Sequence, residues 1–224
     1  QVALFAEQFF GIVALEKLTE RRLSDLVGCT LSAWRLLESF APGQSLVRLY
    51  SPDYEKHGWQ STHTAVEVLH HDIPFLVDSI RMELNRRGYS IHILQNNVLS
   101  VRRTAKGDLQ ELLLKASQGQ GVQQEALIYL EIDRCANAGE MRTIEQALQE
   151  ILEEVRQAVH DFPAMQARAQ ALLLGLDKSK AKVDSAELAE IKVFMSWLLD
   201  NHFTFLGYEE FTLTADKDGA RIIY

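Results

Sequence analysis

The sequence has few cysteines and no long apolar run, and each scarcity excludes a class of protein. Only two cysteines occur in 224 residues, Cys29 and Cys135, and they lie far apart. Because small secreted scaffolds are cysteine-rich, we expect two idle or buried thiols instead of a disulfide. No apolar run approaches the roughly 20 residues that a membrane span needs, and no basic segment followed by an apolar one opens the chain. We therefore expect a cytoplasmic protein without a membrane partner.

Positive charge is also scarce. Lysine and arginine together number 23 against 31 aspartates and glutamates, which gives a formal net charge of -8. Nucleic-acid binders concentrate basic side chains to meet the phosphates, so we expect no nucleic-acid partner. Hydrophobic residues make up 47% of the chain, which suffices for the core of one large or two small domains.

The motifs that hold cofactors and metals are missing as well. Gly119 and Gly121 form a Gly-Gln-Gly in a polar segment, but no third glycine follows and no strand leads into a helix there. His70 and His71 are adjacent in an expected strand, where they point to opposite faces and cannot chelate one ion together. We expect no cofactor and no metal in this segment.

A hydrolytic site is not expected either. Ser61, His63 and Asp72 are of the right residue types, but no strained strand-to-helix turn surrounds the serine. Nothing in the sequence groups a nucleophile, a base and an oxyanion site. The segment therefore has no predicted catalytic residue.

What is present is a strand that runs directly into a helix around residues 71–80. Alternating residues over 62–69 predict the strand, and Leu76, Val77, Ile80 and Leu84 recur at helical spacing after it. We expect Asp72 to cap the helix and Pro74 to lie in its first turn. Gly88 should end the helix in the left-handed conformation.

The following pattern completes an α+β sheet. Residues 90–94 and 98–102 predict one long strand that bends or bulges at Asn96–Asn97, and 126–132 is the clearest strand of the chain. A second helix is expected from Ile144 to Phe162–Pro163. We predict an α+β, ferredoxin-like (βαββαβ) sheet with two helices on one face. The second face, which includes Glu67, Tyr129 and Glu131, is half polar, so we expect water or a partner there.

Four regions are predicted along the chain. They are an N-terminal helical arm (1–42), the α+β domain (43–162), a helical connector with a charged stretch at 177–184 (163–201), and the start of a second β-containing domain (202–224). Strand pattern begins at Phe203, and Asp216–Gly219 is a hairpin signal. Because the sequence opens without methionine and closes in a strand pattern, we expect a piece of a longer protein.

The run Asp72-Ile73-Pro74-Phe75-Leu76-Val77, with Gly88 and Ser90-Ile91-His92 after it, resembles the ACT domain family, whose junction commonly reads D-x-P-G-L-L. The resemblance implies an ACT-like fold for residues 43–162, an ACT-like start for the second domain, and an effector site for a small amino acid at the helix N-terminus. The candidate residues are Asp72, Ile73, Pro74, Phe75, Leu76, Asn96 and Asn97. Phe75 stands where the family has glycine, and a phenyl group there favours a purely structural role.

Three longer motifs resemble the N-terminal region of the large bacterial NAD-specific glutamate dehydrogenase family. They are His57-Gly58-Trp59-Gln60-Ser61-Thr62-His63-Thr64, Pro74–Ser79 with Met82–Arg86, and Asn201–Tyr208. The resemblance implies a very long, homo-oligomeric subunit whose later Rossmann-type domain binds NAD and deaminates L-glutamate to 2-oxoglutarate and ammonium.

The hypothesis is a non-catalytic regulatory and assembly segment that presents a sheet edge, or its half-polar face, to another module or subunit. Two rivals remain open at this point. One is an amino-acid effector sensor, and the other is a self-contained enzyme on a ferredoxin-like fold.

Overall fold

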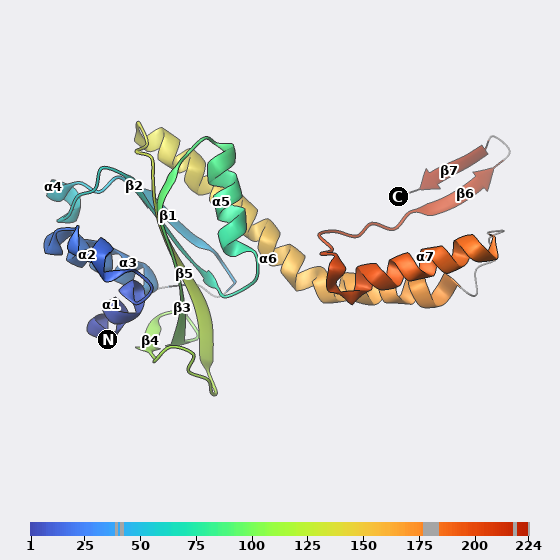
Figure 1. The fold of residues 1–224 in the computed structure, drawn as a ribbon, viewed down its shortest axis with the longest axis horizontal. Coiled ribbons are helices and arrows are strands. Elements are labelled where there is room, and N and C mark those ends of the chain that lie inside the picture. Colours follow the sequence, from blue (N-terminus) through green and yellow to red (C-terminus); the bar gives the residue numbers. More distant parts are fainter. Residues whose placement is uncertain (39, 41–42, 177–183, 217–218, 224) are drawn as a thin grey trace. The chain divides into compact units, whose positions relative to one another are not determined.

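The computed structural model describes residues 1–38, 40, 43–176, 184–216 and 219–223 (Figure 1). The chain forms two compact units, Gln1–Arg156 and Gln157–Tyr224. One continuous helix, α6 (Ala138–Gly175), begins in the first unit and ends in the second. The domain boundaries drawn from the sequence stay a prediction.

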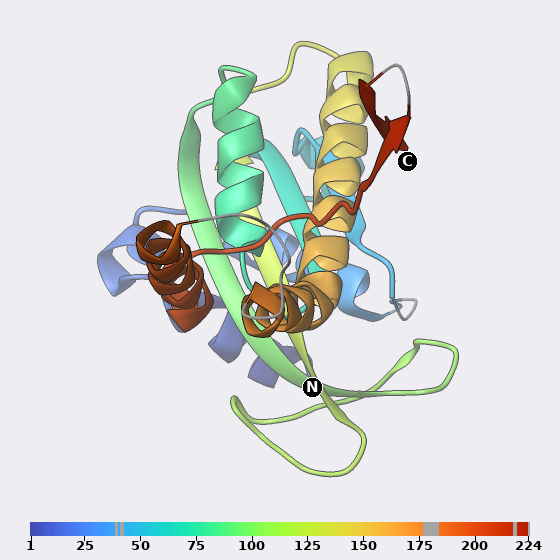
Figure 2. The ribbon, with the colours of Figure 1, turned by 90° about the vertical axis from the view of Figure 1, so that its right-hand side faces the viewer.

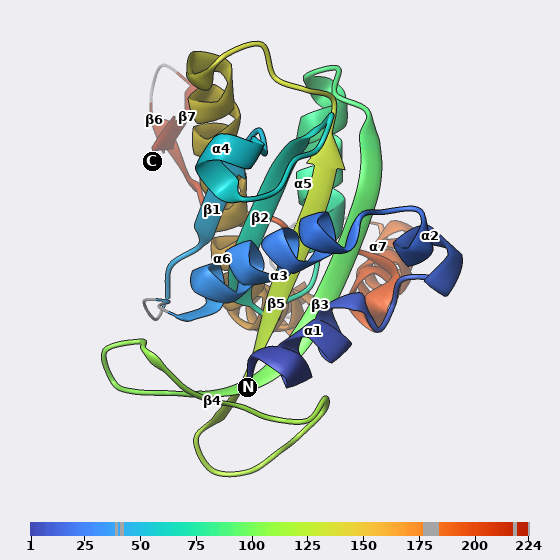
Figure 3. The ribbon, with the colours of Figure 1, turned by 90° about the vertical axis from the view of Figure 1, so that its left-hand side faces the viewer.

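The first unit is built on a five-stranded antiparallel sheet in the order β1-β2-β5-β3-β4 (Figure 3). The strands are β1 (Leu46–Tyr50), β2 (Thr64–His71), β3 (Ile91–Arg103), β4 (Leu109–Leu112) and β5 (Val122–Ile132). The long single strand predicted over 90–102 is confirmed as β3, whereas β4 lies in a stretch where only a connection was expected. In a ferredoxin-like fold the final strand lies beside the first strand. Here β1, which precedes the first βα unit in the sequence, pairs with β2 in that place.

Two helices cover one face of this sheet, as predicted (Figure 2). They are α5 (Leu76–Arg86) and the first half of α6. Their apolar stripes pack on alternate residues of the strands, and the resulting core includes Ile80, Leu84, Leu148, Ile128 and Leu130, with Val155 packed against it. Helical spacing in the sequence put these side chains on one stripe, and burial of that stripe holds the helices on the sheet.

The second face of the sheet is covered by the N-terminal helices (Figure 3). They are α1 (Val2–Phe10) and α3 (Leu23–Glu38), with the short α2 (Leu15–Thr19) between them. Their core includes Phe5, Phe9, Leu37 and Tyr129. The expectation that this face meets water or a partner is wrong, because Glu67, Tyr129 and Glu131 are at most 2% exposed.

Trp59 closes one end of this second core. It follows the short helix α4 (Tyr54–His57) and is buried against Gly28 of α3. A Cβ atom on Gly28 would lie 2.4 Å from the Trp59 Cβ, so only glycine permits this approach. The sheet is therefore the middle layer of a helix–sheet–helix sandwich.

The second unit contains the end of α6, α7 (Ser185–Trp197), a π-helical turn (Leu198–His202) and the hairpin of β6 (Thr212–Asp216) and β7 (Gly219–Ile223). The helix end predicted at Pro163 is wrong, since α6 continues through it; one missing N–H is tolerated within a long ladder of backbone bonds. The strand predicted from Phe203 to Phe211 is not formed, because residues 203–211 have no paired neighbour in the part of the chain that the structure describes. The predicted turn residues Lys217 and Asp218, and residues 177–183 of the charged stretch, lie outside the described residues.

Candidate functional site

The β2–α5 junction has an unusual backbone. Helix α5 begins at Leu76, and its N-cap is Phe75, with φ of 72° and no side-chain cap bond. The predicted cap at Asp72 is therefore wrong; this exposed residue donates its backbone N–H to the Gln124 carbonyl at 3.0 Å. Left-handed φ is costly for a residue with a Cβ, which explains physically why the motif that this stretch resembles has glycine there. Ile73 and Pro74 lead into this turn, and the Phe75 side chain is 50% exposed.

Asn96 and Asn97 lie away from this junction. They pair in regular register with Ile128 and Leu127 of β5, so the bulge predicted at these residues is wrong; the irregularities of β3 fall at Ile91–Ile93 and Arg102–Arg103. Asn97 is buried and donates to the Phe9 carbonyl of α1 at 3.3 Å, whereas Asn96 is exposed. Neighbouring strand residues point to opposite faces, and β5 separates β3 from β2. The strand order thus does not bring the two asparagines to the β2–α5 junction. An effector site made of all seven residues stays a prediction.

Three glutamates are buried on the arm side of the sheet, and each is paired with an arginine. Glu67 accepts from Arg48 Nε and from the Tyr50 hydroxyl, both at 2.9 Å. Glu125 accepts two bonds from Arg103, at 2.6 and 2.7 Å. The third pair joins Glu131 to Arg21, which lies between α2 and α3. Buried carboxylates need such partners, because an unpaired charge costs several kcal/mol in the interior.

Glu131 has the most contacts of the three. Arg21 Nη2 lies 2.8 Å from Oε1, the Tyr129 hydroxyl donates to the same oxygen at 2.7 Å, and the Ser61 hydroxyl donates to Oε2 at 2.9 Å. Burial raises the pKa of Glu131, but attraction to Arg21 and the bonds from Tyr129 and Ser61 outweigh it, so the pKa lies below the usual value. The carboxylate is therefore ionised at neutral pH.

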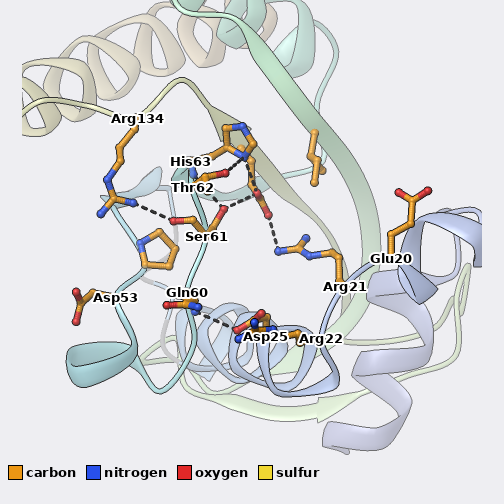
Figure 4. Close-up of a pocket in the computed structure, with 13 residues that line it drawn as sticks. Glu20, Arg21, Arg22, Asp25, Asp53, Gln60, Ser61, Thr62, His63 and Arg134 are labelled. Carbon is orange, nitrogen blue, oxygen red and sulfur yellow. Dashed lines mark hydrogen bonds and ion pairs between the residues drawn. The ribbon is translucent and has the colours of Figure 1, made fainter.

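A polar cavity of about 840 Å³ opens above Glu131 (Figure 4). Segments that are distant in the sequence surround it: the start of α3, the turn before α4, the residues before β2, and the end of β5. Its lining residues are Glu20, Arg21, Arg22, Asp25, Pro52, Asp53, Gln60, Ser61, Thr62, His63, Ile93, Glu131 and Arg134. Sequence reasoning named Ser61 and His63 here but missed the charged residues, because no local pattern joins positions 20–25 to position 134.

Charges of both signs remain available around this cavity. Arg134 Nη1 donates to the Ser61 carbonyl at 2.9 Å, and Asp25 Oδ1 accepts from the Gln60 backbone N–H at 3.1 Å. Asp53 Oδ1 caps α4 through the amides of Glu55 and Lys56. Among the described residues, the Arg22 side chain has no hydrogen bond or ion pair, and the second carboxylate oxygens of Asp25 and Asp53 have none.

A histidine pair lies at the rim. The rings of His63 and His92 stack with centroids 4.1 Å apart, and His92 Nε2 lies 2.7 Å from Asp133 Oδ1. The Ser90 backbone N–H donates to Asp133 Oδ2, and this bond together with His92 lowers the pKa of Asp133 to about 2. Among the described residues no group of three potential metal ligands converges.

The structure also shows where the residues considered for a hydrolytic site, and the adjacent histidines, lie. Ser61 Oγ accepts from the His63 backbone N–H at 3.1 Å, so these two residues do lie together, but Asp72 follows the opposite end of β2. His70 is 2% exposed, and its Nδ1 bonds to the His71 carbonyl. The described residues thus bring no nucleophile together with a base and an oxyanion site.

Among the described residues, most of β3 has an open edge, in addition to the outer sides of the two end strands β1 and β4. Residues 91–99 of β3 pair with β5 on one side, and within the described part of the chain β4 pairs only with residues 101–103 on the other. The exposed side chains along this stretch are His92, Leu94 and Asn96. An unpaired strand edge offers a row of backbone donors and acceptors to a second strand.

An antiparallel sheet with two helices on one face and a proline-marked βα corner has the architecture of an ACT-like α+β domain. The comparison with known families agrees: the family described as "Glutamate dehydrogenase, ACT1 domain" matches residues 5–148. The chain belongs to this family.

Relatives with the printed name NAD-specific glutamate dehydrogenase align with the chain. That of Pseudomonas aeruginosa is 67% identical over 224 residues, and that of Halomonas elongata 45% over 223, covering 100% and 99% of this chain. That of Mycobacterium tuberculosis is 23% identical over 177 residues, or 79% of this chain and 11% of the relative. The chain spans only 14% of the length of the first two relatives.

Proposed function

We propose that this chain is an N-terminal regulatory and oligomerisation segment of an NAD-dependent glutamate dehydrogenase. The complete subunit would convert L-glutamate, NAD and water to 2-oxoglutarate, ammonium and NADH in the cytoplasm, with NAD bound outside this segment. The segment itself takes no part in the chemistry. Its partners are other domains of the same chain and other subunits of a homo-oligomer. No helix in the described residues is long and apolar enough to cross a membrane.

The observation that supports an assembly role is the open edge of β3. The half-polar face that was the other predicted docking surface is already covered by the chain's own helices. The opposite face is covered by α5 and α6. The outer sides of β1 and β4 also have no partner strand among the described residues, but these strands have only 5 and 4 residues. The longer β3 edge is therefore the side where we place a second sheet that extends this one through backbone hydrogen bonds.

Charge at this edge tests the role. We expect the 224-residue chain to be dimeric and Leu94→Lys together with Asn96→Lys to make it monomeric, since paired lysines across a strand junction repel. Met82→Lys, on the exposed outer side of α5, is the matched control and should leave the dimer intact. Light scattering after size-exclusion chromatography measures the mass. A monomeric parent chain would contradict assembly through β3, and so would a double variant that remains dimeric.

A second candidate function is the effector sensor. The polar cavity above Glu131 is the observation that favours it. Within the described residues, Asp25, Asp53 and Arg134 around this cavity each keep polar side-chain atoms that have no partner. This function does not exclude assembly, since ACT-type modules serve as both sensors and contacts.

A further inference from the structure

We propose that the cavity above Glu131, and not the β2–α5 junction, is a binding site for a small zwitterion of the α-amino-acid class. This inference rests on the regulatory part of the proposed function and gives it a place and a ligand chemistry. The cavity lies at the end of β2 that is opposite to Asp72–Leu76, and residues of the N-terminal helical arm line part of it.

The floor of the cavity is rigid and already neutral. Glu131 is 2% exposed and is held by Arg21, Tyr129 and Ser61 at 2.7–2.9 Å. This network compensates the negative charge of Glu131 and holds the Arg21 guanidinium beside the cavity. The ion pair uses Nη2 of Arg21. A preorganised donor of this kind binds a carboxylate without a further cost of ordering a side chain.

Cationic donors meet around Ser61. Figure 4 shows Arg134 and Arg21 reaching toward Ser61 from opposite sides. Arg134 uses Nη1 to bind the Ser61 carbonyl, and within the described part of the chain its other N–H groups have no partner. Arginine forks recognise planar carboxylates in two-point contacts. The carboxylate of the ligand is therefore assigned to this side of the cavity.

Acceptors lie on the side of α3 and α4. Asp25 and Asp53 each have one carboxylate oxygen bound to backbone amides and one oxygen without a partner in the described residues. An ammonium group supplies three donors, which suits two such oxygens. The ammonium of the ligand is assigned here, and a ligand bound in this way would join the helical arm to the residues before β2.

The balance of charge argues against a purely anionic ligand. Once Arg21 and Glu131 compensate each other, Arg22 and Arg134 remain against Glu20, Asp25 and Asp53. A phosphate or a dicarboxylate would meet at least as much repulsion as attraction, whereas a molecule with one charge of each sign meets both. A volume of about 840 Å³ lies within the range of small-ligand sites.

Calorimetry on the 224-residue chain tests this assignment. Each standard L-amino acid is titrated in turn, and for any that binds, the matching 2-oxo acid and the matching decarboxylated amine are titrated as well, with inorganic phosphate alongside. We expect at least one amino acid to bind, and both of its one-charge analogues and phosphate to bind at least tenfold more weakly. Equal binding of the oxo acid or of phosphate would overturn the zwitterion assignment.

Variants decide the location. Arg134→Gln and Asp25→Asn should each weaken binding tenfold or more, and circular dichroism checks that each variant is folded. Arg142→Gln, exposed on α6, and Asp72→Asn, at the junction, are matched controls and should bind as the parent does. Loss of binding in Asp72→Asn alone, or no heat from any amino acid, would overturn the inference. Assembly through β3 is measured independently, so it would survive either result.

Discussion

At the scale of single residues, the buried carboxylates explain how the N-terminal arm is held on the sheet. Arg21 lies between α2 and α3 and reaches Glu131 of β5, and Ser32 of α3 accepts a bond from Arg48, which also binds Glu67. These contacts are directional, so they fix one position of the arm, whereas apolar packing alone tolerates several. We infer that arginine–glutamate pairing specifies the second face of the sandwich.

Loss of one partner should therefore be costly. Arg21→Met leaves Glu131 ionised and buried. We expect the free energy of unfolding to fall by about 2–4 kcal/mol, somewhat less than the about 3–5 kcal/mol typical of broken buried pairs, because Arg21 is partly exposed. Arg22→Met, at the neighbouring exposed position, should change it by less than about 0.5 kcal/mol. Urea denaturation measures both. If both variants lower the free energy of unfolding equally, the Arg21–Glu131 ion pair does not account for the loss of stability.

The same pair predicts a dependence on pH. Because the pKa of Glu131 is lowered in the folded chain, its contribution to stability is full above the pKa of the unfolded carboxyl group. It is lost as the pH falls through the lower, folded value. Denaturation at several pH values should show this loss in the parent chain, and it should be reduced in Glu131→Gln, which keeps the shape of the side chain but does not titrate.

At the scale of elements, the close contact of α3 with the segment after α4 depends on one glycine. Gly28→Ala would place a methyl group 2.4 Å from the Trp59 Cβ. Although alanine favours the helix, the overpacking should dominate and lower the stability by about 1–3 kcal/mol. Gly175→Ala, which meets nothing within 4 Å, is the control and should be neutral or stabilising.

The cause can be separated from a general effect of the substitution. In a Trp59→Gly background the added methyl group of Gly28→Ala meets neither the Cβ atom nor the indole ring of residue 59, so the penalty should disappear in thermal denaturation. If Gly28→Ala destabilises both backgrounds equally, the contact with Trp59 is not the reason for glycine at this position.

At the scale of the whole molecule, the chain is a non-catalytic portion of a much longer protein in this proposal. We expect no reduction of NAD when the 224-residue chain is mixed with L-glutamate and NAD, because the described residues assemble no catalytic set. The full-length subunit, assayed in parallel by absorbance of NADH, is the positive control. Glutamate-dependent NADH formation by the chain alone would favour a self-contained enzyme.

Much of the first unit could be predicted from the sequence because its signals are local. Helical spacing after Leu76 and after Ile144, and strict alternation around Tyr129, depend only on residues within a few positions of one another. These signals placed α5 and α6 on the same face of β5. The local reading failed at Pro163, where a long helix tolerates a residue that would end a short one.

The sequence by itself thus determined the βα corner, the two helices that share one face and the long strand β3. Only the tertiary structure decided that the N-terminal arm covers the second face, that β1 takes the edge beside β2, and that Arg21, Asp25 and Arg134 surround one cavity. Contacts between segments far apart in the sequence leave no periodic signal. A buried glutamate on a strand has the same pattern as an exposed one until its arginine partner is placed beside it.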